Sequence, residues 1–218
     1  GSEMCIRDRN KNLCKTILNE NSINTPNSIL LNNLKNCSNN PFDCFEKKFG
    51  YKPNLFMKPC EDGSSIDIFK ISNDEDYKKA KLNCLNLERE FIFEEEIRGK
   101  EFTVTIIGNQ CYPVIEIKTK NDFYDYDAKY ISDDTILDQA KLSDNELNII
   151  NDIALRAFHA LKCSGWARVD IIQDINGNFN VIEINTVPGM TSHSCVPKSA
   201  SFMGLSYQDV IKEILINV

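Results

Sequence analysis

The feature that most constrains the fold is a pair of apolar segments on either side of a tight turn signal. Residues 167–172 and 179–184 are rich in Val, Ile and Phe, and Asn176-Gly177 lies between them. An Asn-Gly pair flanked by such segments is a strong indicator of a β-hairpin. A two-residue turn there places Asp170 opposite Glu183 and Arg168 opposite Asn185. Because side chains alternate along a strand, these four share one face. The opposite, core-facing side is expected to hold Val169, Ile171, Ile182 and Ile184.

The shared polar face carries two carboxylates directly opposite each other, which repel. A divalent cation removes this repulsion, and two carboxylates with an amide oxygen are ligands that suit Mg²⁺. The hairpin therefore predicts a metal site at Asp170, Glu183 and Asn185. The alternative is an acidic face that is simply solvated.

Around the hairpin, the remaining patterns alternate helices with paired strands. Helices are expected over residues 11–20 and 42–49, from the capping box Ser72-x-x-Glu75 to about residue 86, from the capping box Ser143-x-x-Glu146 to residue 161, and after Ser206-x-x-Asp209. Further strands are expected at 28–31, 55–58, 66–71, 91–97, 102–107 and 112–117. Hairpin-paired strands with helices between the groups indicate an α+β fold on antiparallel sheet.

Three other segments carry groups that suit nucleotide binding. Lys58 ends an apolar strand and is followed by Gly63-Ser64-Ser65, whose N–H groups and hydroxyls can hold a phosphate, although an ordinary turn has the same composition. Glu94 opens an acidic stretch that suits either ribose binding or a charged strand end. Residues 123–130 combine three tyrosines with Lys129, which is typical of a loop that covers a substrate or of a packed surface loop.

Composition narrows the class of protein. The net charge of −7 argues against nucleic acid or an anionic membrane as a partner, and no apolar run reaches the ~20 residues of a membrane span. The nine cysteines are odd in number and form no C-x-x-C pair, which favours reduced thiols in a cytoplasmic protein. Residues 1–9 begin with Gly1-Ser2 and are interpreted as a non-native leader.

Taken together, the segments resemble the D-alanine–D-alanine ligase family. The matching stretches are Lys-Pro-x-x-x-Gly-Ser-Ser at 58–65, Gly-Lys-Glu-Phe-Thr-Val at 99–104, Phe-Tyr-Asp-Tyr-Asp-Ala-Lys-Tyr at 123–130, Gly-Trp-Ala-Arg-Val-Asp at 165–170 and Glu-Ile-Asn-Thr-Val-Pro-Gly-Met-Thr-Ser-His-Ser at 183–194. They follow the family's order from about residue 10 to the end of the chain. One departure is Ile66-Asp67, where the family usually has a small apolar residue and then Gly.

The resemblance implies a role for each matching position. ATP would be bound by Lys11, Lys58, Ser64, Ser65, Glu94, Ile97, Glu101 and Lys129. Asp170, Glu183 and Asn185 would hold Mg²⁺, with Mn²⁺ as the alternative ion. Arg168 and the backbone N–H of Gly189 would stabilise the oxyanion, and Ser194 would hold the carboxylate of the second D-alanine. Ser64 and Tyr130 complete the expected catalytic set, and Tyr130 would favour a D-Ala-D-Ala product over one made with D-lactate.

The implied architecture is the ATP-grasp fold, in which two α+β subdomains with antiparallel sheets clasp ATP. Residues 10–98 would form the small subdomain and residues 99–218 the C-terminal one. The implied reaction makes an acyl phosphate from one D-alanine, which a second D-alanine attacks, for peptidoglycan precursor synthesis. Full-length members of the family are expected to be homodimers.

No segment of the chain matches the family's N-terminal domain, which supplies an acid for the first D-alanine. The chain is therefore expected to bind Mg·ATP and to make little dipeptide. The alternatives are a nucleotide-binding module without turnover and another ATP-grasp carboxylate–amine ligase.

Overall fold

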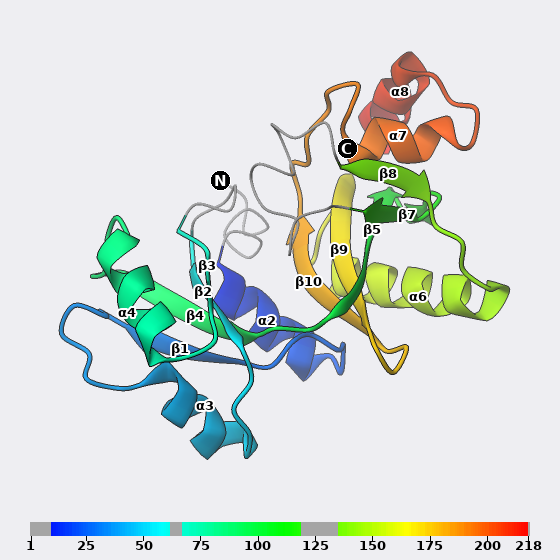
Figure 1. The fold of residues 1–218 in the computed structure, drawn as a ribbon. Helices are drawn as coiled ribbons and strands as arrows, with labels where there is room; N and C mark the ends of the chain where they lie inside the picture. Colours follow the sequence, from blue (N-terminus) through cyan, green and yellow to red (C-terminus); the bar gives the residue numbers. More distant parts are fainter. Residues whose placement is uncertain (1–9, 62–66, 119–134, 218) are drawn as a thin grey trace. The chain divides into compact units, whose positions relative to one another are not determined.

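The computed structural model describes residues 10–61, 67–118 and 135–217 (Figure 1). Their contacts divide them into two compact units, one of residues 10–13 and 26–97 and the other of residues 14–25 and 98–217. The expected division after residue 98 had placed 14–25 with the N-terminal part. In the structure, Asn24 O accepts a hydrogen bond from Val181 N at 2.8 Å, and Arg156 donates to Asn21 O and Ser22 O at 3.1 and 3.0 Å. These bonds explain why residues 14–25 pack with the larger unit.

The smaller unit is a four-stranded antiparallel sheet in the order β1-β4-β2-β3. These strands are β1 (Ser28–Asn32), β4 (Glu90–Glu95), β2 (Leu55–Pro59) and β3 (Phe69–Ile71). Helices α3 (Pro41–Phe49) and α4 (Asp74–Asn83) bury Phe45 and Tyr77 in the same apolar cluster as Met57 and Phe93 of the sheet. Side chains alternate along a strand, so the neighbouring Lys58 and Glu94 lie on the other face.

The two helices of this unit begin at asparagine caps. The side chain of Asn40 accepts hydrogen bonds from Phe42 N and Asp43 N. Helix α3 ends at the predicted residue 49, and Gly50, with a φ of +86°, caps it. For α4 the prediction of a Ser72 capping box was wrong. Asn73, the residue after Ser72, caps the helix instead. Its side-chain carbonyl oxygen reaches the N–H groups of Glu75 and Asp76 and accepts hydrogen bonds from both.

The larger unit contains a six-stranded antiparallel sheet in the order β10-β9-β5-β7-β8, with β6 paired to β5. Its strands are β10 (Phe179–Asn185), β9 (Trp166–Asp174), β5 (Gly99–Ile107), β7 (Ile115–Lys118), β8 (Ile136–Gln139) and β6 (Gln110–Cys111). One face of the sheet packs Phe102, Val104 and Val169 against Leu18 of α2 (Lys11–Glu20) and Phe158 of α6 (Asp144–Ala160).

Two short helices near the C-terminus form a separate cluster in this unit. Helices α7 (Cys195–Ser201) and α8 (Tyr207–Asn217) bury Val196 and Val210 with Ile107 and Tyr112. The predicted caps are present at two helices. Ser143 and Glu146 form the full capping box of α6, and Ser206 exchanges hydrogen bonds with Asp209 at the start of α8.

The predicted strand over residues 112–117 is split into β6 and β7. Ile106 pairs with Cys111, and Tyr112 N still donates to Thr105 O at 2.8 Å. Pro113 comes next and has no N–H to donate, so the ladder is interrupted there before it resumes at Ile115.

The β9–β10 hairpin has the predicted pairing at Asp170 and Glu183, but its turn and the geometry of β10 differ from the prediction. The turn is longer than two residues, since Asp174 N donates to Asn178 O, and Phe179 pairs with Gln173 rather than with Asp174. A β-bulge between Val181 and Glu183 then restores the predicted register, so Glu183 lies opposite Asp170.

The bulge also changes which residue enters the core. Val181 is fully buried in the core cluster, whereas Ile182, which the sequence had placed there, is only partly buried. The bulge thus interrupts the regular alternation of side chains at Ile182, while the polar face of the hairpin stays as predicted.

In the described ranges, no helix is both long and apolar enough to cross a membrane.

Candidate active site

Asp170 is the centre of a polar cluster on β9 and β10. Arg168 lies two residues away on the same face and binds both carboxylate oxygens, with Nε to Oδ1 at 2.8 Å and Nη2 to Oδ2 at 2.7 Å. Burial disfavours the charged guanidinium, but the charge and hydrogen bonds of Asp170 more than offset this and raise the pKa of Arg168. Arg168 is therefore positively charged at neutral pH.

Strand β10 adds the two residues that lie across from this pair. Asn185 Nδ2 donates to Asp170 Oδ2 at 3.2 Å and approaches Glu183 Oε1 at 3.5 Å. The four residues expected to share one face therefore meet through side-chain contacts, and only Arg168 among them carries a positive charge.

Strand β5 contributes a threonine that the sequence reasoning missed. Thr103 lies opposite Asp170 in the ladder, is buried, and donates its hydroxyl proton to Asp170 Oδ1 at 2.7 Å. A signal was present in the sequence, because Glu101, Thr103 and Thr105 alternate with Phe102 and Val104 and so form one polar face. What the sequence did not show is that β5 pairs with β9.

Thr105 lies on the same face, opposite Arg168, and is completely buried. Within the described part of the chain its hydroxyl has no hydrogen-bond partner. The two threonines therefore differ in their hydrogen bonding. The hydroxyl of Thr103 orients a carboxylate, whereas the hydroxyl of Thr105 is buried without a hydrogen bond.

We expect the same substitution to have opposite effects at these two positions. Thr105→Val removes a buried unsatisfied hydroxyl and should raise the free energy of unfolding by about 1 kcal/mol. Thr103→Val removes a donor from a buried carboxylate and should lower it by about 2 kcal/mol. Urea unfolding followed by the fluorescence of Trp166 on β9 measures both. Changes of the same sign would contradict this difference between the hydroxyls.

The chemistry of the cluster fits a hard divalent cation. Its potential ligands are oxygen atoms from two carboxylates and one amide, and the two carboxylates lie opposite each other. Among the described residues, no group of three or more His, Cys, Asp or Glu side chains could hold a metal. A site with only two carboxylates suits Mg²⁺, which keeps several waters and takes other ligands from phosphates.

The loop after β10 brings together the next two expected residues. Ser194 Oγ accepts a hydrogen bond from Thr191 N at 3.0 Å and contacts Thr191 Oγ1 at 2.9 Å. A Cβ atom added at Gly189 would lie 3.0 Å from Ser194 Oγ, so this glycine permits a close approach. Tyr207 of α8 donates its hydroxyl proton to Met190 O at 2.9 Å and fixes the loop from outside.

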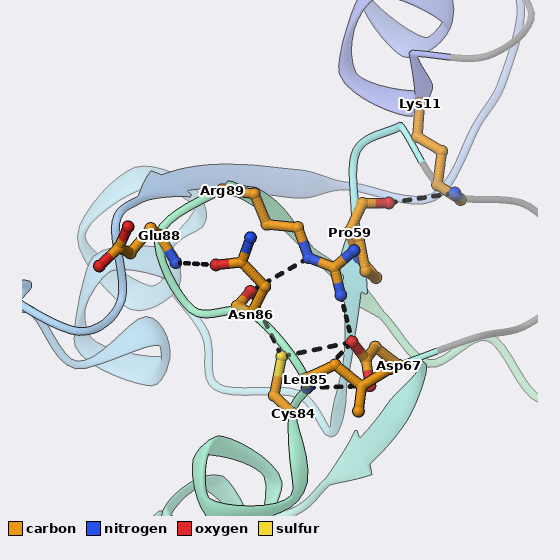
Figure 2. A network of polar contacts seen from close by, with 8 residues as sticks. All are labelled: Lys11, Pro59, Asp67, Cys84, Leu85, Asn86, Glu88 and Arg89. Carbon is orange, nitrogen blue, oxygen red and sulfur yellow. Dashed lines mark hydrogen bonds and ion pairs between the residues drawn. The ribbon is translucent and has the colours of Figure 1, made fainter.

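In the smaller unit, Lys58 and Glu94 form an ion pair across neighbouring strands. Lys58 Nζ lies 2.5 Å from Glu94 Oε1, and the two side chains are only 13% and 6% exposed. A second pair, Lys70–Glu96 at 2.7 Å, involves residues that the sequence did not single out. Lys11 Nζ donates to Pro59 O at 3.0 Å (Figure 2), so this lysine lies at the end of β2, next to Lys58.

The remaining expected residues that the structure describes are Glu101 and Ile97. Glu101 is on the polar face of β5, opposite Ile172, and Ile97 follows β4 and is partly buried. Four expected residues lie outside the described ranges, namely Ser64, Ser65, Lys129 and Tyr130.

Comparison with known proteins decides the family. The family model described as "D-ala D-ala ligase C-terminus" matches residues 17–216. The chain belongs to the D-alanine–D-alanine ligase family. Two D-alanine–D-alanine ligases, from Mannheimia succiniciproducens and Actinobacillus succinogenes, are 40% and 39% identical to it over 162 residues. The match covers 74% of this chain and 53% of each relative, so the chain spans about half of their length.

Solved structures of a D-alanine–D-alanine ligase and of a D-Ala:D-Ser ligase share the fold. The Bacillus anthracis enzyme aligns with a TM-score of 0.81 and 33% identity, over 95% of this chain and 66% of that chain. VanG D-Ala:D-Ser ligase from Enterococcus faecalis aligns with a TM-score of 0.79 and 26% identity, over 97% of this chain and 61% of that one. The expected α+β ATP-grasp fold with antiparallel sheets is thereby confirmed.

Proposed function

We propose that this chain carries the Mg·ATP-binding and bond-forming part of an ATP-dependent ligase that joins two D-alanines for peptidoglycan precursors. The observation that carries the proposal is the polar cluster of Arg168, Asp170, Glu183 and Asn185, centred on the buried Asp170, in a member of this family. A solved relative was crystallised with ATP, the Bacillus anthracis enzyme, which aligns with 28% identity and a TM-score of 0.78 over 95% of this chain and 65% of that one. This supports ATP as the nucleotide.

The chain contains residues that suit each of the two steps of the proposed reaction, which are phosphoryl transfer and attack on the acyl phosphate. Asp170, Glu183 and Asn185 would hold Mg²⁺, which when bound would neutralise phosphate charge and favour transfer of the γ-phosphoryl group to the D-alanine carboxylate. Arg168 is positively charged and its guanidinium is oriented by Asp170, so it suits the negative charge that would develop when a second D-alanine attacks the acyl phosphate. The N–H of Gly189 would add a second donor.

Two further residues would position substrates. Glu94 holds the ammonium group of Lys58 in one place, which prepares this lysine for a phosphate oxygen. Ser194 would hold the carboxylate of the second D-alanine. Its present contacts with Thr191 orient the hydroxyl within the loop that also contains Gly189.

Calorimetry with ATP, in the presence and absence of Mg²⁺, tests the proposal on the chain itself. We expect saturable binding that is much tighter with Mg²⁺, because the carboxylates repel the triphosphate unless a cation lies between them. ADP release with D-alanine, D-serine or D-lactate, measured in parallel, tests ligation and the choice of second substrate. Folded protein without detectable Mg·ATP binding would contradict the proposed function.

A further inference from the structure

Four hydrogen bonds converge on the carboxylate of Asp170, two on each oxygen. Oδ1 accepts from Thr103 Oγ1 at 2.7 Å and from Arg168 Nε at 2.8 Å. Oδ2 accepts from Arg168 Nη2 at 2.7 Å and from Asn185 Nδ2 at 3.2 Å. A carboxylate oxygen offers two lone pairs, so Thr103 and Arg168 together use the hydrogen-bonding capacity of Oδ1.

The contact between Thr103 and Oδ1 has little freedom to change. Thr103 is only 1% exposed, and β5 is paired on both sides at this residue, with Asp170 of β9 and with Ile115 of β7. Rotation about χ1 is restricted in a β-branched side chain. The hydroxyl also lies 3.4 Å from Val169 O, but the carboxylate is nearer and charged and so takes its single proton. A residue from outside the hairpin therefore holds Oδ1 in one direction.

Asn185, the partner of Oδ2 from β10, is held differently. Its Nδ2 lies 3.2 Å from Asp170 Oδ2 and 3.5 Å from Glu183 Oε1, and both contacts are longer than those to Oδ1. An amide carries a nitrogen donor and an oxygen acceptor at equivalent positions, and half a turn of the group exchanges them. With the oxygen turned inward, three oxygen atoms would face one another, an arrangement that a cation stabilises. Oδ2 is therefore the atom of Asp170 that lies with the other two potential metal ligands.

We infer that Thr103 is a positioning residue that, by holding Oδ1, leaves Oδ2 of Asp170 as the single oxygen for Mg²⁺. The inference rests on the proposed function, because it takes Asp170, Glu183 and Asn185 as the metal ligands. Thr103 itself does not touch the ion. Mg²⁺ demands nearly ideal octahedral geometry, whereas Ca²⁺ accepts a carboxylate through one oxygen or through both. Loss of the Thr103 hydroxyl should therefore harm Mg²⁺ binding more than Ca²⁺ binding.

Three variants test the inference. Thr103→Val removes the hydroxyl with little change in volume, whereas Thr103→Ser keeps it. Thr105→Val is the matched control, because Thr105 lies on the same face of β5 and its buried hydroxyl has no hydrogen-bond partner among the residues that the structure describes. Calorimetry gives the Kd of ATP with Mg²⁺, with Ca²⁺ and without a metal, at a temperature at which circular dichroism shows each variant to be folded.

We expect Thr103→Val to weaken Mg·ATP binding about tenfold, the lower end of the effect of losing a group that orients a metal ligand. Ca·ATP binding should weaken less, and the affinity for metal-free ATP should stay the same, because the hydroxyl orients only a metal ligand. Thr103→Ser should keep most of the affinity for Mg·ATP. Thr105→Val should bind all three forms of the nucleotide like the parent chain.

Equal weakening of all three affinities in Thr103→Val would indicate a general loss of structure and would overturn the positioning role. Equal losses with Mg²⁺ and Ca²⁺, at unchanged metal-free affinity, would contradict the assignment of a single oxygen. If the parent chain binds ATP no better with Mg²⁺ than without it, the proposed function fails and the positioning role fails with it. If the parent chain shows this metal dependence and Thr103→Val retains it in full, only the positioning role is refuted.

Discussion

Replacing Asp170 by asparagine is expected to weaken the binding of Mg·ATP about 100-fold or more, while the affinity for metal-free ATP does not fall. The reason is that Asp170 and Glu183 form the only opposed carboxylate pair on the polar face of the β9–β10 hairpin. Loss of one carboxylate removes a ligand charge from the metal but leaves the groups that would contact the nucleotide. Calorimetry with and without Mg²⁺ measures the two affinities.

Two further variants make this experiment specific. Asp174→Asn changes the net charge by the same amount on the same strand, and an asparagine oxygen at that position can still accept the bonds from Asn176 N and Asn178 N. It should bind Mg·ATP like the parent chain. Glu183→Gln should reproduce the metal-dependent loss without removing the partner of Arg168. Equal weakening of Mg·ATP and metal-free ATP in both ligand variants would contradict the metal assignment.

Replacing Gly99 by alanine is expected to lower the free energy of unfolding of the larger unit by about 3 kcal/mol. A Cβ atom at Gly99 would lie 1.7 Å from the carbonyl oxygen of Gln173, a backbone atom that cannot rotate away. The start of β5 would have to separate from the end of β9, where Gly99 pairs with Asp174. Urea unfolding monitored by the fluorescence of Trp166, which lies at the other end of β9, measures the free energy of unfolding of the sheet.

Gly204→Ala is the matched control in the same unit. Gly204 has a φ of +77°, but a Cβ atom there would meet nothing within 4 Å. Its replacement should cost only the strain of the left-handed conformation, about 1 kcal/mol. If Gly99→Ala is no more destabilising than Gly204→Ala, the close approach of β5 and β9 at this point is not a constraint on the fold.

Local signals in the sequence predicted much of the site. The Asn176-Gly177 turn and the apolar alternation on both sides place Asp170 opposite Glu183, and the structure has this pair. The agreement depended on two deviations that cancel, since a longer turn shifts the register by one residue and the bulge at Ile182 shifts it back. A bulge depends on how the strand packs against its neighbours, so the alternation of residue types alone did not reveal it, and Val181 rather than Ile182 entered the core.

The ends of the helices were also predicted correctly only where the local sequence pattern allowed a single interpretation. Where a single capping pattern was present, as at Ser143 and Glu146, the prediction was confirmed. Where two candidate caps were adjacent, at Ser72 and Asn73, the sequence favoured the wrong one. The difference in stability between neighbouring caps is small, and the path of the chain that arrives from β3 decides between them.

The sequence by itself determined most of the elements, though not β8 or α7, and it determined the α+β class, the polar face of the hairpin and, through its motifs, the family. Each of these rests on residues that are close in the chain or on stretches that can be compared directly. Only the tertiary structure decided that β5 lies beside β9 and brings Thr103 to Asp170, that Glu94 holds Lys58, and that Arg89 compensates the charge of Asp67. These pairs join residues 67, 36 and 22 positions apart. No local pattern encodes them, because such contacts form only when distant segments are buried together and a charged or polar group must find its partner there.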